Sequence, residues 1–129
     1  MAHGFRPELI GQVVKRLRAL ADENRIRLLL RLREGECNVT TLTDDFSLGQ
    51  ASVSKHLAVL RDVGLVEVTR QGTQAIYRVR DESVFELCEL VCNGVVRHLQ
   101  QEHAAWAGAI KKSRPTRALR AKSTKGGRK

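Results

Sequence analysis

The sequence has few aromatic residues and few cysteines, and it contains no long apolar run. Phe, Trp and Tyr make up 4% of the 129 residues, so aliphatic side chains must supply most of the core. No apolar run approaches the length of a membrane span, and no secretory signal opens the chain, so we expect a cytoplasmic protein with no membrane partner. Three cysteines cannot build a framework of disulfides, which fits reduced thiols.

The positive charge of the chain is concentrated at its C-terminal end. The formal net charge is +9, and nine of the 23 Lys and Arg residues lie in Lys111–Lys129, which has no Asp or Glu. Positions 1–110 therefore hold fourteen residues of each sign and are neutral. We expect 113–129 to be a disordered basic tail that attracts phosphates without sequence preference. Residues 1–7 are also expected to be disordered, leaving one domain over 8–112.

The spacing of apolar residues predicts a mainly α-helical domain with one small β-hairpin. A helical stripe runs through residues 8–20. A second helix is expected to begin with Asp22 as its N-cap and to end at Gly35. Thr40 or Thr41 is expected to cap a short third helix.

A fourth helix, Gly49–Asp62, is the stretch that most directly suggests a function. Its apolar residues Val53, Leu57 and Leu60 share one face, and a three-residue turn separates it from the third helix. The remaining faces carry short hydroxyls, amides and one lysine, which suit a close approach to base edges and phosphates in a major groove. We therefore predict a helix-turn-helix. Its candidate DNA contacts are Thr40, Gln50, Ala51, Ser52, Ser54, Lys55 and His56.

A hairpin is predicted directly after this helix. Residues 65–70 and 74–80 alternate between apolar and polar side chains, and a turn containing Gly72 separates them. A hairpin in this place is a wing, whose tip is suited to phosphates or a minor groove. The candidate contacts at the tip are Arg70, Gln71, Thr73 and Gln74.

The last predicted helix begins at a cap, Asp81 or Ser83, and reaches Lys112. Its apolar residues cover more than one face, so it needs a partner besides its own domain. We expect a winged helix-turn-helix that dimerises through its first and last helices. Such a homodimer would present two recognition helices to an inverted repeat in double-stranded DNA.

Three segments resemble the arsenic-repressor (ArsR) family of winged-helix regulators. They are ALADENRIRLLL (19–30), ASVSKHLAVLRDVGLV (51–66) and RQGTQAIYRV (70–79), in the order the family has them. The resemblance implies a homodimeric repressor whose affinity for DNA falls when an inducer binds. The family's paired-cysteine metal motif on the third helix is absent, and His98 and His103 do not reproduce its zinc pattern on the last helix.

The three cysteines are the candidate sensor residues. Cys88 and Cys92 stand four apart on the last helix, so both thiols leave one face. The place of Cys37 resembles that of a cysteine in a family subgroup that senses persulfide or oxidants. Cys37 and a thiol of the last helix would be joined by oxidation or a polysulfide, or all three thiolates would bind a soft ion such as trivalent arsenic or cadmium. A third reading treats Cys88 and Cys92 as small apolar core residues.

The function predicted from the sequence is that of a sequence-specific DNA-binding repressor, released from its operator by an inducer sensed at these thiols. No set of residues for nucleophilic or acid-base catalysis can be placed on suitable elements, so we expect no enzyme. Two alternatives remain. One is a DNA-binding regulator with inert cysteines, and the other is a nonspecific architectural DNA binder that acts through the tail.

Overall fold

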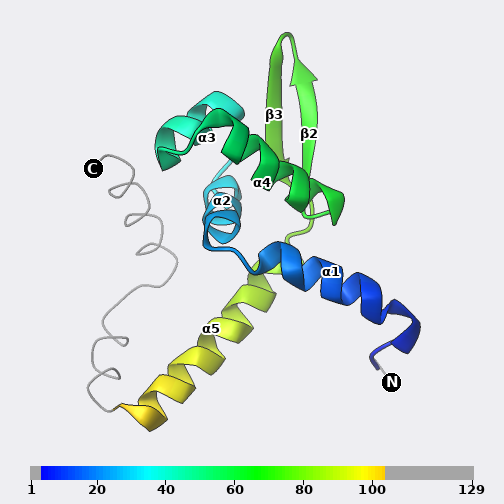
Figure 1. Ribbon diagram of the computed structural model, residues 1–129, viewed down its shortest axis with the longest axis vertical. Helices are drawn as coiled ribbons and strands as arrows, with labels where there is room; N and C mark the ends of the chain where they lie inside the picture. The colour runs from blue at the N-terminus through cyan, green and yellow to red at the C-terminus, as the bar shows by residue number, and fades with distance from the viewer. Residues whose placement is uncertain (1–3, 104–129) are drawn as a thin grey trace.

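Five α-helices and a small antiparallel sheet make up residues 4–103, the part of the chain that the computed structural model describes (Figure 1). The predicted basic tail and the predicted helical residues 104–112 lie outside it. In chain order, after a 3-10 turn at Pro7–Leu9, the elements are α1 (Ile10–Leu20), α2 (Glu23–Arg33), β1 (Cys37–Asn38), α3 (Val39–Phe46), α4 (Gln50–Asp62), β2 (Val66–Gln71), β3 (Gln74–Val79) and α5 (Ser83–Glu102).

The elements form a body with two different ends. Figure 1 shows α2, α3 and α4 packed together at the foot of the β2–β3 hairpin, which projects away from them, while α1 and α5 diverge at the opposite end. The predicted winged helix-turn-helix is confirmed. Among residues 4–103, no helix combines the length and the apolar content needed to cross a membrane.

The core is aliphatic, as the scarcity of aromatic residues requires. Leucine and valine side chains from α2, α3, α4 and the strands fill it, and Tyr77 and Phe85 join them. The fully buried side chains, each below 2% exposed, are Leu28, Leu29, Leu42, Val53, Leu57, Leu60, Leu65 and Val66. This cluster holds the helix-turn-helix as one unit.

The predicted start of α2 is confirmed, but that of α3 is wrong. Asp22 caps α2, since its Oδ1 accepts a hydrogen bond from the backbone N–H of Arg25 at 3.1 Å. Neither Thr40 nor Thr41 caps α3. Asn38 does, with its Oδ1 accepting from the N–H of Thr41 at 2.8 Å. The extended backbone of Asn38 in β1 places the cap earlier than the threonines suggest.

Gly64 ends α4, as predicted. The N–H of Leu65 bonds to the carbonyl of Leu60, and the N–H of Gly64 bonds to that of Arg61, both at 3.0 Å. These bonds form a Schellman motif, which requires the positive φ of +80° that Gly64 adopts. The chain therefore leaves α4 in a fixed direction towards β2.

The sheet has one strand more than the predicted hairpin. Its order is β1-β3-β2, and β2 pairs with β3 from Val66↔Val79 to Gln71↔Gln74, across a turn at Gly72 with φ +64°. The extra strand β1 is two residues long and pairs Cys37 with Tyr77. So short a strand offers no alternating pattern that a sequence reading can detect.

The last helix starts next to the predicted cap residues, with Glu82 rather than Asp81 or Ser83 at the N-cap position, and it ends earlier than predicted. Asp81, the residue before the N-cap, still bonds to the first residue of α5: its Oδ1 accepts from the backbone N–H of Ser83 at 3.0 Å and from its hydroxyl at 2.6 Å. α5 runs to Glu102, and His103 has extended backbone.

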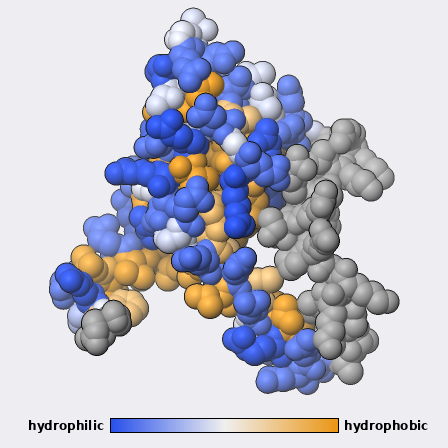
Figure 2. All heavy atoms as spheres, turned by 180° about the vertical axis from the view of Figure 1, so that it is seen from behind, coloured by the Kyte–Doolittle hydropathy of each residue, from blue (hydrophilic) through white to orange (hydrophobic). Residues whose placement is uncertain are grey.

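Apolar side chains on α1 and α5 face solvent in the single chain. Figure 2 shows them at the end of the molecule away from the wing, below a mostly hydrophilic surface. Leu90 is the most exposed of them at 69%. The set comprises Leu9, Ile10, Val14, Leu17, Leu90, Val91 and Val95. We call these residues the α1/α5 apolar surface.

Candidate nucleic-acid interface and thiol groove

The helix α4 presents a polar N-terminal half to solvent. Its buried face, Val53, Leu57 and Leu60, packs into the core, and the helix contacts α2, α3 and β2. On the opposite side Ala51 and Lys55 are exposed, as is Gln50 in the first turn, while Ser52 and Ser54 are half-buried at the flanks. Gly49 caps α4 without a side chain, so the first backbone N–H groups lie beside this polar surface, where they suit contact with a phosphate.

The wing tip supplies a second exposed polar surface. Arg70, Gln71, Thr73 and Gln74 are all exposed around the β2–β3 turn. The amide of Asn38 donates to Oε1 of Gln74 at 3.3 Å, which ties the tip's last residue to the start of α3. Thr40, also exposed, lies in the first turn of α3.

One ring nitrogen of His56 contacts another side chain of the same domain. The Nη1 of Arg25 lies 3.3 Å from Nδ1 of His56, and the Nε of Arg25 donates to the carbonyl of Ala19 at 2.6 Å. His56 therefore joins α4 to α2 and the end of α1.

Cys88 and Cys92 line one apolar groove between α1, α2 and α5. Both thiols are half-buried and free, and the groove encloses about 690 Å³. Burial raises the pKa of the Cys88 thiol. The groove is lined by Leu17, Leu20, Ala21, Ile26, Leu30, Arg33, Phe85, Leu87, Cys88, Glu89, Val91, Cys92 and Asn93.

Cys37 lies in a different environment. It is 7% exposed on β1, with Thr41, Arg31 and Asp45 near its thiol, and it does not line the groove. Burial raises its pKa, and the nearby Arg31 guanidinium offsets part of that effect. Within residues 4–103 no three His, Cys, Asp or Glu side chains stand close enough to hold a metal ion. A three-thiolate site would therefore need a rearrangement or a second chain.

Comparisons with known proteins agree with this geometry. The family model for bacterial regulatory proteins of the arsR family matches residues 22–68. The arsenical resistance operon repressor of Bacillus subtilis (strain 168) is 33% identical over 90 residues, which are 67% of this chain and 86% of that protein. This chain belongs to the ArsR family. The regulator NmtR of Mycobacterium tuberculosis is 38% identical over 79 residues, covering 61% of this chain but only 66% of NmtR.

A solved structure supports the same family. The solution structure of a homodimeric winged helix-turn-helix domain, Mb0332 from Mycobacterium bovis, matches with a TM-score of 0.64 and 32% identity. The match covers 80% of this ArsR-family chain and 97% of that one. The domain is described as that of a possible ArsR-family transcriptional regulator.

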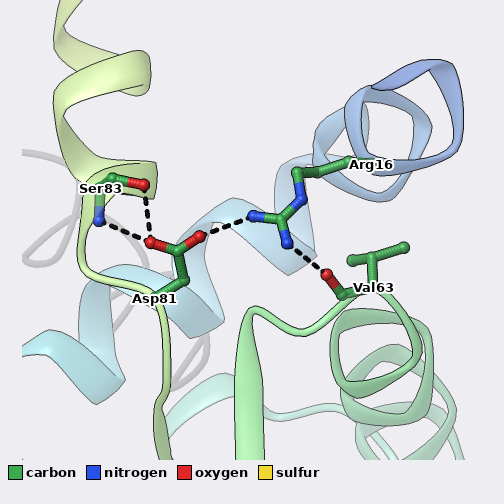
Figure 3. A network of polar contacts seen from close by, with 4 residues as sticks. All are labelled: Arg16, Val63, Asp81 and Ser83. Carbon is green, nitrogen blue, oxygen red and sulfur yellow. Dashed lines mark hydrogen bonds and ion pairs between the residues drawn. The ribbon is translucent and has the colours of Figure 1, made fainter. Parts of the chain in front are cut away.

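One polar network in this ArsR-family protein was missed by the sequence analysis. Arg16 of α1 donates from Nη1 to Oδ2 of Asp81 at 2.8 Å and from Nη2 to the carbonyl of Val63 at 2.7 Å (Figure 3). Hydrogen bonds from Ser83, followed by that from Arg16, lower the pKa of Asp81. Nothing in the local sequence marks Arg16, because its partners are 47 and 65 residues away.

Proposed function

We propose that this ArsR-family protein is a transcriptional repressor that binds an operator in double-stranded DNA as a homodimer. The observation that carries the proposal is the separation of two surfaces. The polar N-terminal half of α4 and the wing tip lie at one end of the molecule, and the α1/α5 apolar surface lies at the other (Figures 1 and 2). One end is suited to nucleic acid and the other to a second chain.

The exposed apolar side chains of α1 and α5 support the homodimer. Six large apolar residues exposed on these two helices, with Leu9 of the preceding 3-10 turn, would be costly to leave in water. A two-fold interface formed through them would cover both copies at once and would set the two α4 helices in opposite orientations. Such a pair reads an inverted repeat whose half-sites are about 10 base pairs apart, centre to centre.

Selection from a random duplex library tests this function without a known operator. The expected result is a set of enriched sequences that share an inverted repeat, bound by a species with twice the chain mass in analytical ultracentrifugation. A monomer, or enrichment of no common sequence, would contradict the proposal. Glu82→Gln, an exposed change near α5 and outside both surfaces, serves as a matched control that should enrich the same repeat.

We further propose that the inducer acts at the thiols that line the groove. Cys88 and Cys92 share a face of α5 next to α1 and α2, so a bound soft ion or a sulfur bridge there would shift α5 against those helices. A shift of α5 would move the α1/α5 apolar surface. Because the two chains would meet at that surface, the distance between their α4 helices would change. The B. subtilis relative is named an arsenical resistance operon repressor, which favours a thiol-seeking inducer.

Cysteine variants separate the possible sensors. After exposure to arsenite or to polysulfide, native mass spectrometry should show a mass increase that Cys88→Ser and Cys92→Ser each remove, along with release from DNA. If Cys37→Ser and one of the two α5 variants, but not the other, remove the response, a bridge from Cys37 to that α5 thiol replaces the groove pair as the sensor. If no variant changes the release, the cysteines are inert.

A further inference from the structure

A single guanidinium joins both helices of the α1/α5 apolar surface to the end of the recognition helix. Arg16 leaves α1 between the C-terminus of α4 and the N-terminus of α5, as Figure 3 shows. One nitrogen, Nη2, donates to the carbonyl of Val63 at 2.7 Å, and the other, Nη1, donates to Asp81 at 2.8 Å. Figure 3 therefore shows one side chain bonded to Val63, at the end of α4, and to Asp81, just before α5.

The bond to Val63 acts on the end of α4. Val63 is the C-cap residue, and the last carbonyls of a helix have no partner within the helix. A cation at this end also complements the negative end of the helix dipole. The packing is close, because a Cβ placed on Gly64 would lie 3.5 Å from Nη2 of Arg16. The guanidinium therefore sits against the turn that directs the chain out of α4.

The bond to Asp81 extends the connection to α5. Oδ2 of Asp81 accepts from Arg16, while Oδ1 accepts from the backbone N–H and the hydroxyl of Ser83, the first residue of α5. One carboxylate thus holds the guanidinium and the start of α5 together. A second link between α1 and α4, the pair Lys15–Asp62, is longer at 3.9 Å and joins two largely exposed side chains. Exposed pairs of that kind contribute little.

We propose that Arg16 is a positioning residue for DNA recognition. It fixes the direction of α4 relative to α1 and α5, and therefore fixes the distance between the two recognition helices of the homodimer. The inference rests on the proposed operator-binding function. It adds that selectivity for the spacing of the half-sites depends on a residue far from the exposed face of α4.

The test compares two operators that differ only in the spacing of their half-sites. One is the repeat selected by the wild-type protein, and the other has one base pair inserted between the half-sites. The wild-type protein should discriminate between them. Arg16→Met should bind the selected operator about tenfold more weakly and lose most of this discrimination, with the dimer intact in ultracentrifugation. Arg16→Lys should not rescue it, because a single ammonium does not reproduce the fork that reaches both acceptors.

Two further variants make the result decisive. Lys15→Met, the adjacent exposed position, should bind both operators as the wild type does. Asp81→Asn keeps an oxygen that can accept from Ser83 but loses the charged acceptor for Arg16, so it should reduce discrimination in the same direction. If Arg16→Met does not fold, Asp81→Asn still tests the positioning role of Arg16.

The possible outcomes separate this inference from the proposed function. If the wild-type protein binds DNA selectively and Arg16→Met keeps the discrimination, the positioning role is wrong while the repressor function stands. An equal loss of affinity for both operators that follows a loss of thermal stability would also overturn it, since that pattern shows a purely structural role. A wild-type protein that selects no sequence would contradict the repressor function itself.

Discussion

Arg25 on α2 holds His56 on α4, with 3.3 Å between Nη1 of the arginine and Nδ1 of the histidine. The same guanidinium donates to the backbone carbonyls of Ala19 and Arg18 at the end of α1, at 2.6 and 3.2 Å. Its side chain is 17% exposed. The position of α4 therefore depends on a second arginine, which contacts the half-buried His56 at the flank of the helix.

Removal of this arginine should lower the stability of the domain. Arg25→Ala deletes hydrogen bonds from a charged donor to two carbonyls; such bonds contribute roughly 1.5–3 kcal/mol each after exchange with water, and less where water can replace the lost donor at the end of α1. We expect the free energy of unfolding to fall by about 1–3 kcal/mol in urea titrations. Arg61→Ala, an exposed change on α4, is the control and should leave the midpoint unchanged. Equal midpoints for both variants would contradict the structural role of Arg25.

A negative charge on the exposed half of α4 should prevent DNA binding. Ser54→Glu places a carboxylate at the flank of the surface that we assign to DNA, where it would face phosphates. Like charges that meet at an interface cost several kcal/mol, so affinity in a gel-shift titration should fall by more than about a hundredfold. Gln101→Glu adds the same charge to an exposed position of α5 and should bind as the wild type does. Retained affinity of a folded, dimeric Ser54→Glu protein would place the DNA surface elsewhere.

Stability should fall at acid pH, partly through Asp81. Bonds from Ser83 and Arg16 lower the pKa of this carboxyl from its ordinary value of 3.8, so the ionised form is the one that favours the folded state. The contribution of Asp81 to the free energy of unfolding is complete when the pH is above the ordinary carboxyl pKa. It is lost as the pH falls through the lower pKa that Asp81 has in the folded state. Unfolding free energies measured at about pH 6 and about pH 3 should differ less in Asp81→Asn than in the wild type. Identical differences would show that Asp81 is not a source of the pH dependence.

The thiols of Cys37 and Cys88 should react slowly at neutral pH. Burial raises the pKa of both, and the thiolate is the reactive form. Alkylation by iodoacetamide, followed residue by residue by mass spectrometry, should be slower than that of free cysteine at about pH 7 and should still rise above about pH 8.5. Cys37, the more buried of the two, should be the slower. Modification of either thiol at the rate of free cysteine would contradict this description of their surroundings.

Local patterns in the sequence were enough to predict most of the elements. The spacing of Val53, Leu57 and Leu60 identified α4 and its buried face, and all three are fully buried. Gly64 was predicted to end that helix, and it does so through its positive φ. Both depend on neighbouring residues alone, which is why periodicity and turn chemistry found them.

The features that the sequence did not reveal depend on distant contacts. β1 exists because Cys37 and Asn38 pair with β3, about forty residues later, and Asn38 then displaces the threonines as the cap of α3. Arg16 looked like one more polar residue of an amphipathic helix, yet it bonds to Val63 and Asp81. The sequence grouped three cysteines, whereas the fold brings Cys88 and Cys92 to one groove and places Cys37 outside it.

Operator binding by a chain that lacks residues 113–129 tests most directly whether α4 and the wing read the DNA. The selected inverted repeat and a scrambled duplex would be titrated with full-length and shortened protein over a range of salt concentrations. Preference for the repeat should survive the deletion, and affinity should depend less steeply on salt because fewer phosphates are neutralised. Loss of all preference with the tail would contradict recognition by α4 and the wing and would favour a nonspecific architectural binder.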